Sequence, residues 1–228
     1  MKVQVVIPAA GLGLRLKTIR PKPFVLLNGK PIISYTLDVF QKSPLIDSVI
    51  VAANEKNISD FKGLIKQYRL TKIKKIIVGG STRRESVFKG LKNLDHDTDV
   101  VVIHDGARPF VTLVLVEQVV GALKKNKAAV VAVPVKSTIK KVNGRTMTAK
   151  ETLDRRILWE IQTPQVFKKD VILKAHKEVK DKDPSDDALL VEKLGVKVKI
   201  VMGDYKNIKI TTEDDLIFAK ALIALPVI

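Results

Sequence analysis

Apolar runs of strand length alternate with amphipathic stretches of helix length along most of this chain. Such alternation is typical of βαβ units, in which helices cover a mainly parallel sheet. The pattern predicts strands at Val3–Pro8, Ser48–Ala53, Lys75–Val78, Val100–Ile103, Ala129–Val135 and Val196–Val201. It predicts helices at Ile32–Gln41, Ile58–Tyr68, Glu85–Leu94, Leu113–Lys125, Lys169–Lys180, Asp186–Leu194 and Glu213–Ile223. We therefore expect a three-layer α/β/α fold around a twisted, mainly parallel sheet.

A polar and basic stretch interrupts the alternation at about residues 136–154. Asn143-Gly144 stands in its middle, and Asn-Gly between strand-like flanks is a strong hairpin signal. We expect a protruding β-arm that leaves the sheet, returns to it and serves as an oligomer contact. The sequence shows no internal repeat, low-complexity tract or Pro/Gly linker. Residues 1–228 are therefore expected to form a single domain with this arm.

Three polar or glycine-rich loops follow predicted strands, at Ala9–Arg15, Gly79–Ser86 and His104–Phe110. Ligands of such sheets bind at the carboxyl ends of the strands, so we expect these loops to converge. In the first loop small residues let backbone N–H groups approach phosphate oxygens closely. Positive charge follows at Arg15, Lys17, Arg20 and Lys22. The pattern predicts a polyanion site, although it is neither a P-loop nor a dinucleotide fingerprint.

Composition narrows the classes of protein further. The chain has no Cys, which excludes disulfides and thiolate chemistry and fits a reducing cytoplasm. No apolar run approaches the length of a membrane span, so we expect a cytoplasmic protein without a membrane partner. Lys and Arg exceed Asp and Glu by 17 charges, which leaves a basic nucleic-acid-binding module as an alternative. The basic residues are scattered without aromatic interleaving, so we favour a lysine-rich surface and expect no nucleic-acid partner.

The opening loop resembles that of nucleotidyltransferases of the nucleotide-diphospho-sugar type, in which AAGxGxR is followed by Pro-Lys. Further stretches narrow the resemblance to the 2-C-methyl-D-erythritol 4-phosphate cytidylyltransferase family. In the family's order they are GGSTRRESV (79–87), IHDGARPF (103–110), LDRRILWEIQTPQVF (153–167), SDDA (185–188) and NIKIT (207–211). The resemblance covers almost the whole chain. It implies an enzyme of non-mevalonate isoprenoid biosynthesis that couples CTP to 2-C-methyl-D-erythritol 4-phosphate and releases pyrophosphate.

The resemblance also implies roles for individual residues. Arg15 and Lys22 match the pair that holds the triphosphate, and Arg155 and Lys209 match residues that position the attacking phosphate. These four are the candidate catalytic residues. The positions that would grip CTP are Ala9, Ala10, Gly11, Gly13, Gly80, Ser86 and Gly106. The substrate-side positions are Asp105, Arg108, Thr138, Arg155, Thr163 and Lys209, of which Thr138 and Arg155 would come from the arm of a second subunit in a homodimer.

The sequence departs from the family pattern at two positions. It also leaves open a closely related activity with another acceptor. Pro23 stands where Gln is more usual, and Gly106 where Ala is common. A ribitol 5-phosphate cytidylyltransferase shares the fold, the opening loop and Thr-Pro-Gln, so it remains the alternative acceptor specificity. A catalytically inactive scaffold of the same fold is a further alternative. The stretch 158–161 before Gln162 looks like that of the erythritol enzyme, which we favour.

The expected chemistry needs few side chains that exchange protons. A phosphate monoester has its second pKa near 6, so the nucleophile is already mostly deprotonated at neutral pH. The requirement is in-line positioning and charge stabilisation by Arg, Lys and Mg²⁺ carried on the triphosphate. Asp105 is the candidate carboxylate near this metal. His104 is interpreted as structural, and Asp186 with Asp187 as the acidic start of a helix.

Overall fold

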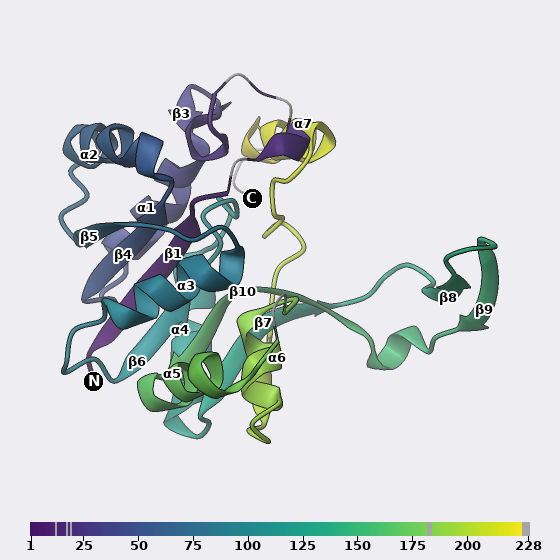
Figure 1. Ribbon diagram of the computed structural model, residues 1–228. Helices are drawn as coiled ribbons and strands as arrows, with labels where there is room; N and C mark the ends of the chain where they lie inside the picture. Colours follow the sequence, from purple (N-terminus) through teal and green to yellow (C-terminus); the bar gives the residue numbers. More distant parts are fainter. Residues whose placement is uncertain (12, 17, 19, 182–183, 225–228) are drawn as a thin grey trace.

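A computed structural model of the protein describes residues 1–11, 13–16, 18, 20–181 and 184–224. Its centre is a seven-stranded sheet in the order β11-β7-β10-β6-β1-β4-β5 (Figure 1). The strands are β1 (Val3–Ala9), β4 (Ser48–Ala53), β5 (Ile73–Val78), β6 (Val100–Ile103), β7 (Ala128–Pro134), β10 (Trp159–Lys168) and β11 (Val198–Met202). All six predicted strands are confirmed, with ends that shift by at most two residues.

Strand β10 is the strand of the central sheet that the sequence pattern missed. It pairs antiparallel with both β6 and β7, whereas the other pairs of this sheet are parallel. Proline cannot donate to a sheet ladder, so Pro164 argues against a central strand at this place. The structure accommodates it by a shift of register between Ile161 and Gln165. The sheet is thus mainly parallel, as expected, with one reversed strand near its middle.

Helices cover both faces of the sheet and give the predicted three layers. Val3, Val5 and Ile7 of β1 pack in one core with α1 (Ile32–Lys42), α2 (Ile58–Gln67) and α4 (Leu113–Gly121). Val6 points to the other face and packs in a second core with α3 (Arg83–Lys92), α5 (Lys169–Glu178) and α6 (Asp187–Glu192). Because side chains alternate along a strand, one buried apolar run serves both layers.

A smaller cluster joins the first loop to the C-terminal helix α7 (Glu213–Ala224). It contains Leu16 from the first loop, Ile210 from the segment before α7, and Leu27 from β2 (Leu26–Leu27), which pairs with β3 (Lys30–Pro31). Figure 1 shows this purple N-terminal segment beside the yellow helix α7. The cluster therefore holds two segments that are far apart in the sequence at the same end of the sheet.

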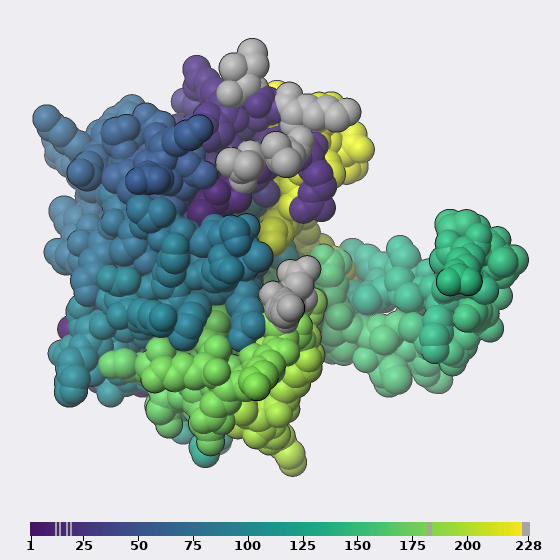
Figure 2. Space-filling model, in the orientation of Figure 1, coloured from purple at the N-terminus to yellow at the C-terminus, as the bar shows by residue number. Residues whose placement is uncertain are grey.

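The predicted arm is a two-stranded hairpin that stands away from the body of the protein (Figures 1 and 2). Its strands are β8 (Lys140–Asn143) and β9 (Thr148–Thr152), and nearly all their residues are exposed. Asn143-Gly144 does not form a two-residue turn. The connection is residues 144–147, in which Met147 takes a positive φ of 53°. The hairpin is confirmed, although its loop is longer than Asn-Gly suggests.

None of the helices in the described part of the chain is long and apolar enough to cross a membrane.

Candidate active site

A pocket of about 560 Å³ opens where the loops after β1, β5 and β6 meet. Among the described residues, its charged lining consists of Arg15, Lys22, Arg83, Lys209 and Asp105. Every position expected to grip CTP also lines it, namely Ala9, Ala10, Gly11, Gly13, Gly80, Ser86 and Gly106. The predicted convergence of the three loops is therefore confirmed. Lys17, which the sequence pattern adds to the basic loop, lies outside the described residues.

The other predicted substrate-side residues lie elsewhere. Arg108 and Thr163 are buried behind Asp105 and are absent from the described lining of the pocket. Thr138 and Arg155 are exposed at the base of the arm, where Arg155 Nη1 donates to the carbonyl of Lys136 at 2.7 Å. Within one chain the structure thus brings Arg15, Lys22 and Lys209 together and leaves Arg155 outside the pocket.

Asp105 is the centre of one wall of the pocket, which we call the acid wall and define as Asp105, Arg83 and Lys209. Its Oδ1 accepts from Arg83 Nε at 2.9 Å, and its Oδ2 lies 2.8 Å from Lys209 Nζ. Burial alone would raise the pKa of this carboxyl group, but the charges of Arg83 and Lys209 outweigh burial and hold the pKa well below its usual range. Asp105 is therefore ionised and fixed by two cations.

A directed chain of hydrogen bonds fixes the backbone of the acid wall. The Asp105 N–H donates to Thr163 Oγ1 at 3.1 Å, and His104 Nε2 lies 3.2 Å from the Arg108 carbonyl oxygen. A carbonyl only accepts, so Nε2 carries the proton and Nδ1 accepts from the Thr163 hydroxyl at 3.0 Å. Burial lowers the pKa of His104 to about 4, which keeps the ring neutral. The structural interpretation of His104 is confirmed.

The segment that carries Lys209 is fastened to the same turn. Asn207 is buried, its Nδ2 donates to the Thr163 carbonyl at 2.9 Å, and its own carbonyl accepts from Arg108 Nη1 at 2.7 Å. The Ile210 N–H donates to the Ala107 carbonyl at 2.9 Å. Arg108 and Thr163 thus act in this structure as supports that place Lys209 beside Asp105.

The opposite wall, which we call the first-loop wall, consists of Gly13, Arg15 and Lys22. Gly13 has a φ of 66°, and a Cβ there would lie 2.5 Å from Lys22 Cβ, so only glycine fits without strain. Leu16 is buried and pins the loop, whereas Arg15 next to it is exposed. Burial, together with the charges of Lys209 and Arg15, lowers the pKa of Lys22 to about 8.

The loop after β5 forms another edge of the pocket, and a cap at the start of α3 makes this loop rigid. Thr82 Oγ1 accepts from the Glu85 N–H at 3.1 Å, and Glu85 Oε2 accepts from both the N–H and the hydroxyl of Ser81. Ser86 Oγ accepts from the Gly80 N–H at 3.0 Å. This arrangement is a capping box extended into the loop, and it fixes the backbone that lines the pocket.

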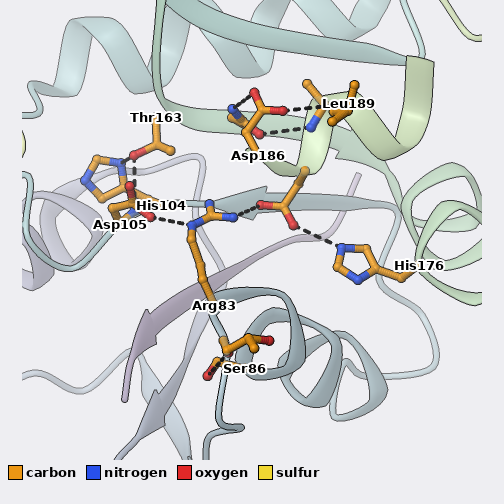
Figure 3. Close-up of polar contacts among 12 residues, drawn as sticks. Arg83, Ser86, His104, Asp105, Thr163, His176, Asp186 and Leu189 are labelled. Carbon is orange, nitrogen blue, oxygen red and sulfur yellow. Dashed lines mark hydrogen bonds and ion pairs between the residues drawn. The ribbon is translucent and has the colours of Figure 1, made fainter. Parts of the chain in front are cut away.

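Arg83 is the charged residue of the described pocket lining that the sequence reasoning missed. Helix α3 begins at Arg83, not at Glu85, so a cation stands in the first helical turn. Positive charge is unfavourable there, because the amino end of a helix is itself positive. A cation at the amino end of a helix was therefore the signal in the sequence that could have identified Arg83 as a site residue. The cause of this conflict lies in Asp105 and Asp187, both of which pair with Arg83 (Figure 3).

The two acidic residues at the start of α6, Asp186 and Asp187, have different roles. The sequence pattern predicts Ser185 as the N-cap, but the N-cap of α6 is Asp186, whose Oδ1 accepts from the Leu189 N–H at 2.9 Å (Figure 3). Asp187 instead has a side chain that is 2% exposed and bonds to Arg83 Nη1 at 2.7 Å. Its partner is 104 residues away, so sequence spacing could not reveal the pair.

The pocket fits a metal ion that enters already bound to the phosphate groups of a ligand. Among the described residues, no group of three or more His, Cys, Asp or Glu side chains could hold a metal ion. Both oxygens of Asp105 already face cations. Mg²⁺ takes oxygen ligands and is commonly bound through one or two carboxylates together with substrate phosphates. Asp105 is therefore suited to be at most one protein ligand of a metal that phosphate oxygens also hold.

The fold and the cationic pocket place the chain among the nucleotidyltransferases with a nucleotide-diphospho-sugar transferase-like fold. A family model described as 2-C-methyl-D-erythritol 4-phosphate cytidylyltransferase matches residues 3–224. The enzyme of that name from Halalkalibacterium halodurans is 46% identical over 226 residues, which are 98% of each chain. The chain therefore belongs to the 2-C-methyl-D-erythritol 4-phosphate cytidylyltransferase family.

Solved structures agree with this assignment. The 4-diphosphocytidyl-2C-methyl-D-erythritol synthase of Anaerococcus prevotii superimposes with a TM-score of 0.87 at 34% identity, over 98% of this chain and 96% of that one. The 2-C-methyl-D-erythritol 4-phosphate cytidylyltransferase of Thermus thermophilus gives a TM-score of 0.81 at 33% identity, over 99% and 100%. The predicted family and fold are both confirmed.

Proposed function

We propose that this protein transfers the cytidylyl group of CTP to 2-C-methyl-D-erythritol 4-phosphate and releases pyrophosphate. A phosphate oxygen of the acceptor attacks the α-phosphorus of CTP. The bond between that phosphorus and the oxygen bridging to the β-phosphate breaks, and pyrophosphate leaves with the electron pair. The observation that carries this proposal is the pocket whose described lining gathers Arg15, Lys22, Arg83 and Lys209 around the carboxylate of Asp105.

The proposed reaction brings two polyanions together, and the pocket supplies what this requires. The acceptor phosphate is mostly deprotonated at neutral pH and needs no general base. Arg15 and Lys22 would stabilise the charge that develops on the triphosphate, and Lys209 would orient the attacking phosphate across the pocket. Mg²⁺ bound to the triphosphate, with Asp105 as its protein ligand, would screen the repulsion further. The small residues Ala9, Ala10 and Gly80 leave backbone groups accessible to the nucleotide.

The arm is proposed to complete the site of a second subunit in a homodimer. Thr138 and Arg155 are exposed and lie outside the pocket of their own chain, as a role in a partner's site requires. Exposed apolar side chains stand beside the base of the arm. Ile161 and Met202 flank Ala132 in register on neighbouring strands and are 38% and 57% exposed. We propose that residues 1–228 form one domain and that this face, with the arm, contacts a second copy in the cytoplasm.

Pyrophosphate release tests the proposed reaction directly. The protein is incubated with Mg²⁺, each of the four nucleoside triphosphates, and either 2-C-methyl-D-erythritol 4-phosphate or ribitol 5-phosphate. We expect release with CTP and the erythritol acceptor, and much less with the other combinations. Preference for ribitol 5-phosphate would move the assignment to the competing activity. No release from folded protein with any pair would reject a cytidylyltransferase function.

A further inference from the structure

Arg83 spans two buried carboxylates that lie on different sides of it. Its Nε donates to Asp105 in the pocket at 2.9 Å, and its Nη1 donates to Asp187 at 2.7 Å (Figure 3). The Arg83 side chain is 28% exposed, whereas those of Asp105 and Asp187 are 9% and 2% exposed. The guanidinium is planar and its donors point in fixed directions, so a hold on one nitrogen fixes the direction of the others.

Asp187 is in turn held from behind by His176. His176 Nε2 lies 3.0 Å from Asp187 Oδ1, and the ring is fully buried and stacks on Phe88 at 5.7 Å with an interplanar angle of 13°. The charge of Arg83 and the hydrogen bond from His176 outweigh burial and lower the pKa of Asp187, so this carboxyl group is ionised and accepts from the ring N–H. The order of contacts is therefore His176, Asp187, Arg83 and Asp105.

The elements that carry this series are themselves fastened together. Arg84 Nη2 donates to the Val179 carbonyl at 2.7 Å, which ties the start of α3 to the carboxyl end of α5. Gln165 Nε2 donates to Asp186 at 2.8 Å and its Oε1 accepts from the Ala188 N–H, which ties α6 to β10. Because these helices cannot shift independently, Asp187 presents a fixed anchor to Arg83.

A purely structural ion pair between α3 and α6 does not account for this arrangement. Such a pair would need one carboxylate, and buried ion pairs contribute little net stability compared with apolar packing. Here two carboxylates share one guanidinium, and Asp105 has two further cations near it, Lys209 Nζ at 2.8 Å and Arg108 Nε at 3.9 Å. These cations keep Asp105 charged and in place in the pocket.

We propose that Arg83 is a positioning residue for Asp105, and that Asp187 and His176 set its position from outside the pocket. This proposal rests on the proposed function in so far as Asp105 serves the acceptor side or the metal. Asp187 is not among the described residues that line the pocket, so a change at Asp187 reaches the pocket through Arg83. Loss of the negative charge of Asp187 frees the guanidinium of Arg83 and leaves one extra positive charge beside the triphosphate site. Acceptor use should fall, whereas CTP binding should stay the same or become tighter.

The experiment compares Asp187→Asn with Asp186→Asn as a matched control. Both variants make the same chemical change at the start of α6, but Asp186 bonds to Leu189 and Gln165 and not to Arg83. For Asp187→Asn we expect kcat/KM for the acceptor to fall roughly 10- to 100-fold, the range seen when a supporting residue is lost. Titration calorimetry should show CTP affinity unchanged or increased. Asp186→Asn should stay within about twofold of wild type on both measurements.

A double-mutant cycle shows whether Asp187 acts through Asp105. In an Asp105→Asn background, Asp187→Asn should have almost no further effect on acceptor use, because the group that it positions is already lost. An equally large effect in that background would overturn the proposal. So would equal behaviour of the two single variants, or a parallel loss of CTP binding and melting temperature in Asp187→Asn, which a structural role predicts.

Crystal structures of the two single variants provide a readout that does not depend on turnover. The contact between Arg83 Nε and Asp105 Oδ1, 2.9 Å here, should persist in Asp186→Asn and be lost in Asp187→Asn. An unchanged contact in Asp187→Asn would refute the proposal whatever the kinetics. If the wild-type protein released no pyrophosphate, the proposed function would fail, but these structures would still decide whether Asp187 positions Arg83.

Discussion

The two walls of the pocket differ in how completely their charges are paired. In the acid wall, Asp105 contacts both Arg83 and Lys209 within hydrogen-bond distance. In the first-loop wall, the side chains of Arg15 and Lys22 make no hydrogen bond or ion pair with the described residues. One wall is organised before any ligand arrives, whereas the other presents cations that lack an anion.

The pKa shifts express the same difference. Burial would raise the pKa of Asp105, but the charges of Arg83 and Lys209 lower it and favour its charged form, whereas burial together with the charges of Lys209 and Arg15 lowers the pKa of Lys22 and disfavours its charged form. A bound polyanion would reverse the effect on Lys22. The comparison teaches that preorganisation here belongs to the carboxylate side, and that the lysine side is completed by the substrate. The following predictions test this division.

Loss of an unpaired cation should have the largest effect. Lys22→Met should lower kcat/KM roughly 100- to 1000-fold, the range expected when one group that stabilises transition-state charge is removed. The melting temperature should stay near that of wild type, because Lys22 supports no ion pair in the described fold. Steady-state pyrophosphate release measures the effect, and Lys42→Met on the surface of α1 is the control. Equal activity of both variants would remove Lys22 from the mechanism.

The charge state of Lys22 predicts a pH dependence. With a pKa of about 8 in the free protein, about one lysine in ten is protonated at pH 9, so CTP affinity should fall about tenfold between pH 7 and pH 9. Calorimetry in buffers of different ionisation enthalpy should also detect proton uptake on binding. In Lys22→Arg the decline should be absent, because guanidinium stays protonated. A decline of the same size in that variant would assign it to another group.

The same shift has a defined sign for stability. The pKa of Lys22 is lower in the folded protein than in the unfolded chain, so the unfolded chain binds more protons between about pH 8 and pH 10.5. The contribution of Lys22 to the free energy of unfolding therefore rises with pH across this window. Denaturant titrations of wild type and Lys22→Met should diverge there, with wild type gaining relative stability as pH increases.

Mixing two inactive chains tests whether a third wall comes from a partner. If Arg155 acts in the neighbouring subunit, heterodimers of Arg15→Ala and Arg155→Ala chains contain one intact site out of two. Random association of equal amounts should then restore about a quarter of wild-type activity. Recovery should require subunit exchange and grow with incubation time. Activity that stays at the level of the separate variants would place Arg155 in its own chain's site or outside the mechanism.

The smallest effect is expected at the floor between the walls. A Cβ on Gly106 would lie 2.5 Å from Cδ1 of Ile33, whose side chain is fully buried. Gly106→Ala should lower the free energy of unfolding by about 1–2 kcal/mol through overpacking. Ile33→Val removes the conflicting methyl group, so the double variant should be more stable than additivity predicts. Strict additivity in denaturant melts would contradict this explanation.

The sequence revealed those parts of the site that follow local rules. Loops after strands converge because parallel strands end at one edge of the sheet, which is why Gly11, Lys22, Gly80 and Asp105 could be grouped in advance. The resemblance to the family added Lys209. Strand β10 was missed because Pro164 breaks the pattern that identifies a central strand, and tertiary pairing with β6 and β7 overrides it.

The remainder depends on contacts between distant segments. Asp187 looked like an ordinary first-turn acid, and only the fold reveals that it pairs with Arg83. Arg83 violated a helix-end preference, and such local conflicts tend to mark functional or strained positions. The roles of Arg108 and Thr163 as buried supports could not be read from spacing either, because both act through bonds to Asn207 and Asp105.

The exposed hairpin β8–β9 has a consequence for the exchange of amide hydrogens with solvent. Two-stranded hairpins without a covered face are only marginally stable in water, so the hairpin can open without unfolding the sheet. Its deuterium uptake should be fast in dilute samples and slow whenever another surface covers it. Uptake at residues 140–152, followed against protein concentration, would thus serve as a gauge of self-association in solution.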